Sequence, residues 1–154
     1  MLIKLIRNQS SGSAIIGRLV IDGRWFCNTL ERKGYEILAL CYRVQVTMSP
    51  KFKRLLPLVT GVPRTPQSGY GTATPMGRAD SAIGYRQGIR IHRGSKPEHS
   101  TGCILVPAEK EKELTDLILK AQNTHEEIIL EVSDFKPGSE YGYNTPCERE
   151  LQKR

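Results

Sequence analysis

The stretch IIGRLVIDGRWFCNTL, residues 15–30, decides the fold class of this chain. Its apolar segments at 15–21 and 25–30 are typical of strands, and Asp22-Gly23 between them is a strong signal for a two-residue hairpin turn. Residues 3–6 predict an earlier strand, which a turn at 10–13 would connect to this hairpin. The chain is therefore expected to open as antiparallel β-structure.

Further strands follow along the chain. Residues 42–48 alternate apolar and polar side chains, as a half-buried strand does, and Ser49-Pro50 ends the pattern. Residues 60–87 are rich in Gly, Pro, Ser and Thr, which predicts a long loop. Residues 88–92 and 103–106 are short apolar segments and predict two more strands.

One helix is expected after these strands. Pro107 stands where a helix would begin, and Glu109 and Glu111 in its first turn suit the helix dipole. The core-facing positions have i, i+3, i+4, i+7 spacing: Leu114, Leu117, Ile118 and Ala121. Residues 128–132 predict a closing strand. The sequence therefore predicts one α+β domain over residues 1–135, mainly β, with an antiparallel sandwich or barrel and a polar tail at 136–154.

Length and composition restrict the class of protein. The 154 residues suit one domain, and no apolar stretch is long enough to span a bilayer. The first residues, MLIKLIR, lack the apolar core of a secretory signal, so the encoded chain is expected in the cytoplasm. The net charge is +7, but the basic residues are scattered and no nucleic-acid-binding motif is present. We expect no nucleic-acid partner; the oligomeric state stays open.

The four cysteines form no CxxC pair and have no zinc-ligand spacing, so no metal or cofactor is expected. An even count permits disulfides, but a chain without a signal sequence makes them less expected. Cys27 and Cys41 lie in strand-like segments and are interpreted as buried, inert thiols. Cys147 lies in the polar tail.

Chemistry is concentrated between His92 and Cys103. Two adjacent strands joined by a polar loop would bring an imidazole beside a thiol, and a thiolate formed by that base is a nucleophile. Gly102 would allow a sharp turn, and the backbone N–H groups of Gly102 and Cys103 could stabilise an oxyanion. A backbone carbonyl, that of Arg93, could fix the His92 ring. The structural alternative is a small core cysteine and a surface histidine.

Five neighbours are candidate substrate-binding residues: Arg90, Arg93, His99, Ser100 and Thr101. Arg90 shares a strand face with His92, opposite Ile89 and Ile91, and could bind a substrate carboxylate. His99 has the alternative interpretation of a solvated loop residue. Ser100 has that of a turn cap.

The run from His92 to Ser100-Thr101-Gly102-Cys103-Ile104, followed by a strand, a helix and a closing strand, resembles the catalytic end of L,D-transpeptidases over about residues 88–132. That family has a His-Gly segment and then Ser-His-Gly-Cys-Ile-Arg, so Thr101 stands at a family histidine. The chain also resembles an uncharacterised phage and bacterial family over about residues 15–132, through pieces that include Ser49-Pro50-Lys51-Phe52 and Ile89–Gly94.

The L,D-transpeptidase resemblance implies an enzyme acting on peptidoglycan stem peptides. Cys103 would attack the bond between the L-centre of a diamino acid and a terminal D-alanine, forming a thioester. A second amine would give a cross-link, and water a trimmed peptide, with His92 as base and then acid. A substrate in the wall would be reached through lysis, a phage particle or a secretion system.

Two alternatives remain open. One is a general amidase or peptidase that uses the same pair of residues. The other is a non-catalytic phage or secretion-system component that keeps the fold.

Overall fold

The computed structural model of this chain describes residues 1–63 and 85–134. Its first three strands form an antiparallel meander: β1 (Leu2–Ser11), β2 (Ala14–Ile21) and β3 (Arg24–Arg32). Asp22 and Gly23 have φ values of 47° and 85° between β2 and β3. Two successive positive φ values are the requirement of a type I′ hairpin turn, so the Asp-Gly prediction is confirmed.

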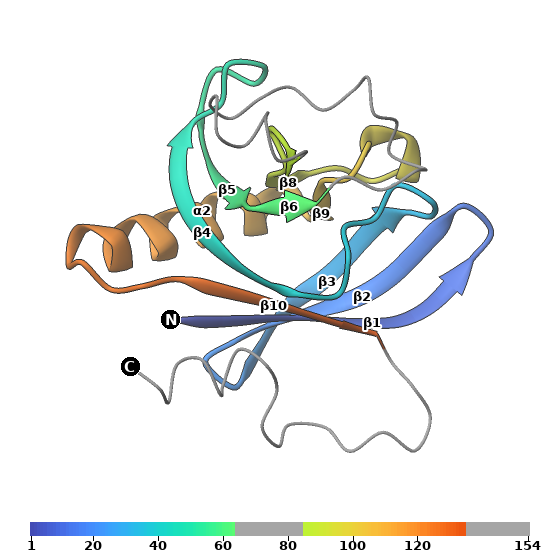
Figure 1. Ribbon diagram of the computed structural model, residues 1–154, viewed down its shortest axis with the longest axis horizontal. Helices are drawn as coiled ribbons and strands as arrows, with labels where there is room; N and C mark the ends of the chain where they lie inside the picture. The colour runs from blue at the N-terminus through green and yellow to red at the C-terminus, as the bar shows by residue number, and fades with distance from the viewer. Residues whose placement is uncertain (64–84, 135–154) are drawn as a thin grey trace.

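The meander belongs to an eight-stranded sheet in the order β5-β4-β10-β1-β2-β3-β9-β8. The other five strands are β4 (Cys41–Met48), β5 (Leu55–Thr60), β8 (Ile91–Arg93), β9 (Ile104–Val106) and β10 (Ile129–Asp134). Only β1–β10 and β8–β9 pair in parallel among these strands. The two edges meet, because Leu58 of β5 forms a bridge with Arg90 and the Val59 N–H donates to the Ile89 carbonyl at 2.8 Å. The sheet therefore curls into a nearly closed barrel (Figure 1).

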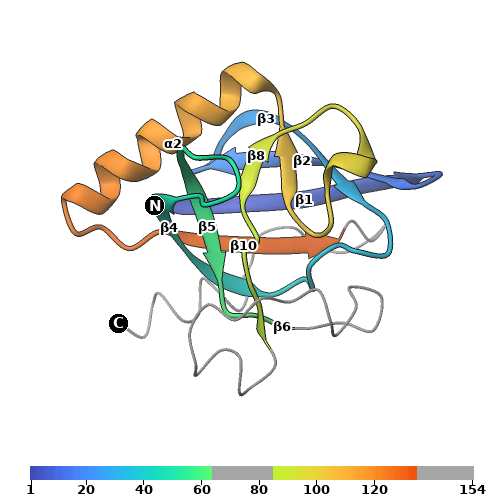
Figure 2. The same cartoon turned by 90° about the horizontal axis from the view of Figure 1, so that it is seen from above.

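The helix α2 (Ala108–Asn123) packs against β4, β5 and β8, on the side of the barrel where the two sheet edges meet (Figure 2). Leu114, Ile118 and Ala121 are buried as their spacing predicts, whereas Leu117 is 38% exposed. A short 3₁₀ helix, η1 (Pro97–His99), precedes β9. The described residues thus form an α+β structure that is mainly β, as predicted. Within these ranges no helix has the length and apolar character needed to cross a membrane.

Three features differ from the sequence-based expectation. The strand β5 was not predicted, and it accommodates Pro57 because it is the last strand in the order of the sheet, where a missing N–H is tolerated. The predicted loop at 60–87 contains the paired strands β6 (Val62–Pro63) and β7 (Tyr85–Arg86) at its ends. Residues 64–84 and the predicted tail at 136–154 lie outside the described residues.

The cysteines also differ from expectation. Cys27 is buried in the core and free, as predicted. Cys41 begins β4, is half-buried, and is disulfide-bonded, so its interpretation as an inert free thiol is wrong. The sequence pattern indicates the strand at Cys41 but not which thiol the fold brings beside it.

Candidate active site

A pocket of about 480 Å³ opens where three segments meet: the β4–β5 loop, the residues before β8, and the turn between η1 and β9. Its lining includes six residues with charged, aromatic or nucleophilic side chains: Lys51, Phe52, Arg90, His92, His99 and Cys103. We call it the Cys103 pocket. The fold therefore brings together the two residues that the sequence singled out as nucleophile and base.

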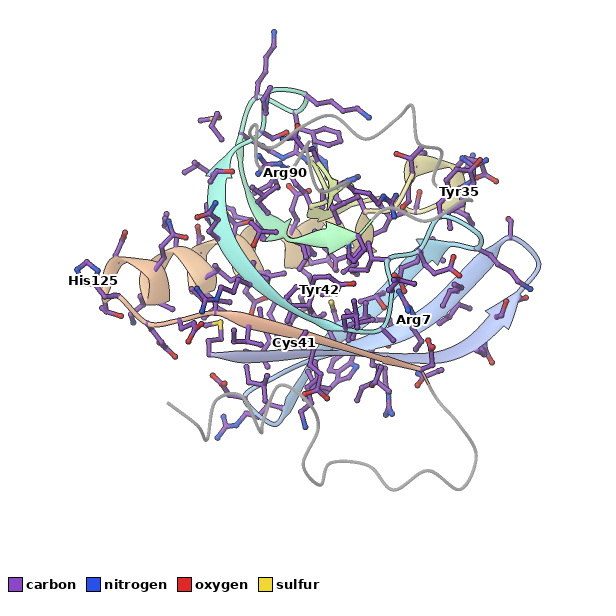
Figure 3. The ribbon with its side chains drawn as sticks, in the orientation of Figure 1. Arg7, Tyr35, Cys41, Tyr42, Arg90 and His125 are labelled. Carbon is purple, nitrogen blue, oxygen red and sulfur yellow. The ribbon has the colours of Figure 1, made fainter. Side chains whose placement is uncertain are left out.

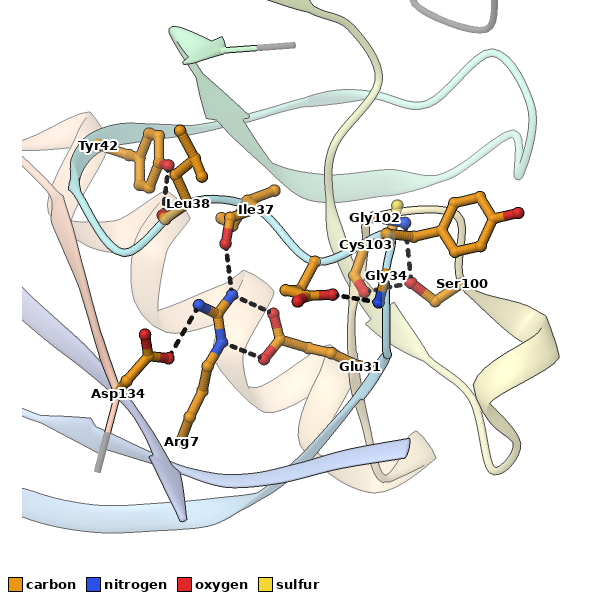
Figure 4. Close-up of polar contacts among 12 residues, drawn as sticks. Arg7, Glu31, Gly34, Ile37, Leu38, Tyr42, Ser100, Gly102, Cys103 and Asp134 are labelled. Carbon is orange, nitrogen blue, oxygen red and sulfur yellow. Dashed lines mark hydrogen bonds and ion pairs between the residues drawn. The ribbon is translucent and has the colours of Figure 1, made fainter. Parts of the chain in front are cut away.

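Ser100 shapes the turn that presents Cys103. Its hydroxyl accepts a hydrogen bond from the Gly102 N–H at 3.1 Å and donates to the Cys103 carbonyl at 2.6 Å (Figure 4). The side chain is 1% exposed. A buried hydroxyl that satisfies two backbone groups orders a turn, so Ser100 is a turn cap, as its alternative interpretation predicted.

Gly102 is required at its position by Arg86. Its φ is +133°, and a Cβ added there would lie 2.0 Å from a guanidinium nitrogen of Arg86. That guanidinium is buried and donates to the carbonyls of Thr101 and Tyr35. The space over Gly102 is thus filled by Arg86, and the Gly102 N–H, a predicted oxyanion donor, is engaged by Ser100 instead.

Cys103 lies just before β9 and is half-buried at the pocket. Its sulfur accepts the Arg90 backbone N–H at 3.4 Å and lies 3.6 Å from the Gly88 carbonyl, to which the thiol can donate. Burial raises the pKa of the thiol, while the Arg90 N–H and the charges of Lys51, Arg86 and Arg90 lower it. Burial prevails, so Cys103 rests as a neutral thiol and needs a base to become nucleophilic.

His92 of β8 is 4% exposed and has a fixed ring orientation. Its Nδ1 lies 2.9 Å from the Arg93 carbonyl, which makes Nδ1 the protonated nitrogen and leaves the Nε2 lone pair to act as a base. The predicted partner of the ring is therefore confirmed. The Phe52 ring packs against the imidazole at a centroid separation of 4.6 Å. Burial is the main cause that lowers the pKa of His92, so the imidazole is neutral at pH 7.

The sulfur and the imidazole line the same pocket without a direct bond. Among the hydrogen bonds of residues 1–63 and 85–134, none joins His92 to Cys103. Both groups rest in the neutral state, so the pair is a thiol and a base rather than a preformed ion pair. Proton transfer between them needs a closer approach or one bridging water, a common condition of sites without substrate.

No family model, curated protein or solved structure matches this chain. In the described part of the chain, no group of three or more His, Cys, Asp or Glu side chains is placed to hold a metal ion.

The predicted substrate-binding residues are distributed unevenly around the Cys103 pocket. His99 and Thr101 line it and are exposed, and His99 Nδ1 accepts the Ser95 N–H at 3.3 Å. Arg93 is exposed but is not among the lining residues; only its backbone contacts the site.

Arg90 lines the pocket on the predicted face, but its guanidinium is directed to β4 and β5 (Figure 3). It donates to the carbonyls of Thr47, Met48 and Leu56 and to the Thr47 hydroxyl, at 2.9–3.2 Å. These contacts use the donors that would otherwise bind a substrate carboxylate.

Four residues of the site were not singled out from the sequence: Lys51, Phe52, Arg86 and Glu111. Lys51 and Phe52 belong to Ser49-Pro50-Lys51-Phe52, a piece that carries one of the two resemblances, so a signal for them was present. Arg86 lies in the predicted loop, and Glu111 was interpreted only as a charge in the first turn of a helix. Their roles depend on neighbours that are distant in sequence.

Proposed function

We propose that this protein is a cysteine acyltransferase or hydrolase that acts on peptidoglycan stem peptides, as an L,D-transpeptidase or L,D-carboxypeptidase does. The observation that supports it best is one pocket that holds a half-buried neutral thiol and a buried neutral imidazole with a fixed tautomer. The resemblance of residues 88–132 to the catalytic end of L,D-transpeptidases supplies the substrate class.

The reaction would proceed in two halves. Nε2 of His92 takes the thiol proton as the Cys103 sulfur attacks the acyl carbon of the bond to the terminal D-alanine. The C–N bond then breaks, His92 returns the proton to the leaving amine, and a thioester remains. An amine from a second stem gives a cross-link, and water gives a shortened peptide; in both cases the thiol is regenerated.

Charge on the oxygen of the tetrahedral intermediate requires a donor near the sulfur. Because the Gly102 N–H is bound to Ser100, we assign this role to the Cys103 N–H. Because the Arg90 guanidinium is engaged by β4 and β5, we assign the substrate carboxylate to Lys51, an exposed lining residue whose charge also lowers the pKa of Cys103 and of His92.

The test is incubation with disaccharide tetrapeptides and mass spectrometry of the products. We expect wild type to release the terminal D-alanine or form a dimer, and Cys103→Ala to lose at least 1,000-fold in rate, on the order of the loss for a removed nucleophile. Cys27→Ala is the matched control, because it removes the buried free thiol of the core and leaves the pocket intact.

A carbapenem provides a second readout of the same sulfur. Wild type and Cys27→Ala should gain the mass of one acyl adduct, and Cys103→Ala should gain none. Turnover that persists in Cys103→Ala would remove this cysteine from the mechanism. A folded wild type without turnover or adduct would favour the non-catalytic alternative, and release of other peptide ends would favour a general peptidase.

A further inference from the structure

A buried carboxylate binds Arg93, the residue whose carbonyl holds the His92 ring. Glu111, in the first turn of α2, is 6% exposed, and its carboxylate accepts three hydrogen bonds. Two come from Arg54, from Nε at 2.8 Å and from Nη2 at 2.9 Å, and the third comes from the Arg93 backbone N–H at 2.5 Å. A buried charge is costly unless donors compensate it, and these donors come from two separate segments of the barrel.

The Arg54–Glu111 pair contacts both groups that hold the imidazole in place, Arg93 and Phe52. The Glu111 carboxylate binds the N–H of Arg93, and the carbonyl of Arg93 binds His92 Nδ1 at 2.9 Å. On the other side, the Arg54 guanidinium lies 5.2 Å from the centroid of the Phe52 ring, which packs on His92. The ion pair therefore joins the hydrogen-bond partner of the ring to its packing partner.

We propose that the Arg54–Glu111 ion pair is a positioning device for His92, which fixes the Nδ1–H tautomer and directs Nε2 into the Cys103 pocket. The pair replaces, at one remove, the carboxylate that orients the base in a Ser-His-Asp triad. This inference deepens the proposed function, since it affects turnover only if His92 is the base.

The two members of the pair act on the charge of His92 in opposite directions. After burial and the Arg93 carbonyl, Glu111 is the next influence on the pKa of His92 and raises it, whereas Arg54 lowers it. Lys51 of the β4–β5 loop also lowers it. The other titratable and charged groups at the pocket are Cys103, Arg90 and His99. Removing Glu111 should therefore lower the pKa of His92 further, and removing Arg54 should raise it.

Imidazole NMR of His92 tests this in wild type, Glu111→Gln and Arg54→Met. We expect the pKa to fall by roughly half a unit or more in Glu111→Gln and to rise by a similar amount in Arg54→Met. Both variants should also weaken the Nδ1–H signal of the neutral ring. Glu113→Gln is the matched control, because Glu113 is on the same helix but 53% exposed, paired with Lys110 at 3.2 Å.

Two outcomes would overturn the proposal: wild-type pKa and tautomer in both variants, or changes of the same sign in both. If Arg54→Met does not fold, Arg54→Lys serves instead; it keeps the charge, so the pKa should stay near wild type while the Nδ1–H signal weakens.

The NMR readout needs no turnover, so the two proposals fail separately. Suppose that the protein is inactive on muropeptides but the pKa of His92 falls in Glu111→Gln and rises in Arg54→Met. This result would refute the proposed function and keep the positioning role. An active enzyme in which neither variant shifts the pKa of His92 would keep the function and refute the positioning role. In an active enzyme we also expect kcat of Glu111→Gln to fall about 10–100-fold with little change in KM, as for a misoriented base.

Discussion

At the scale of single residues, the character of Cys103 results from opposing influences on one sulfur. Burial keeps the proton on the thiol, while the Arg90 N–H and three nearby cations favour the thiolate. His92 is neutral for the same reason that Cys103 is, because burial disfavours the charged form of each. The site is thus suited to a general-base mechanism, in which the thiolate forms only as the sulfur attacks.

Gly102 is expected to tolerate no side chain without a loss of stability. Gly102→Ala should reduce the free energy of unfolding by about 2–4 kcal/mol, since it combines backbone strain of about 1–3 kcal/mol with displacement of Arg86. Gly12→Ala is the control, because Gly12 also has a positive φ, of +59°, but has nothing within 4 Å of an added Cβ. Urea denaturation measures both variants. Equal losses would show that Arg86 moves aside without cost.

At the scale of secondary-structure elements, the parallel pair β8–β9 places the chemistry. Ile91 pairs with Ile104 and His92 with Leu105, and the Ile104 N–H donates to the Arg90 carbonyl at 3.0 Å. This register sets Cys103 beside Arg90, two residues before Leu105, the residue that pairs with His92. The base and the sulfur therefore reach the same pocket from neighbouring strands, but they do not lie directly opposite each other.

The Arg90 guanidinium joins the segment before β8 to the ends of β4 and β5, so we expect it to stabilise the arrangement of these elements. Arg90→Met should destabilise the fold by about 2–4 kcal/mol, since it leaves several carbonyls without a donor at about 1–3 kcal/mol for each buried one. Arg43→Met on β4 removes an exposed pair with Glu127 and should cost about 0–1 kcal/mol.

Thermal or urea unfolding of both variants decides between two roles of Arg90. If Arg90→Met is as stable as Arg43→Met but binds muropeptides weakly, the guanidinium serves substrate and the carboxylate partner is Arg90 rather than Lys51.

At the scale of the whole molecule, a buried ion pair centred on Arg7 connects β1, β3, the β3–β4 connection and β10. Arg7 of β1 donates from Nε and Nη2 to the two carboxylate oxygens of Glu31 in β3, at 2.9 and 2.8 Å (Figure 4). Its guanidinium also binds the Ile37 carbonyl at 2.7 Å and Asp134 of β10 at 3.4 Å. The pair thereby fixes the β3–β4 connection against the sheet.

Arg7→Met and Glu31→Leu should each destabilise the fold by about 3–5 kcal/mol, because each leaves a buried charge without its partner. The double variant should be less destabilised than the sum of the two, by at least 1 kcal/mol or so, because it removes both charges. Lys112→Met, which removes an exposed pair with Asp116, is the control and should cost little. Additive losses in urea denaturation would contradict this account.

Local patterns in the sequence predicted much of this fold. The Asp22-Gly23 turn, the alternation of residues 42–48 and the amphipathic spacing through Leu114, Ile118 and Ala121 each depend on neighbours within a few residues. The strand β5 was missed because the local signal of Pro57 opposes a strand, and only its place at the edge of the sheet makes the proline acceptable.

The sequence by itself determined the fold class, the order of most elements, and the two residues that carry the proposed chemistry, since these depend on side-chain type and short-range periodicity. Only the tertiary structure decided what surrounds them. Arg54, Phe52 and Glu111 reach His92 from separate elements, Arg86 fills the space over Gly102, and Arg90 is directed to β4 and β5. Burial and hydrogen bonding between residues far apart in the chain control these roles, and no local pattern specifies which distant groups the closed sheet brings together.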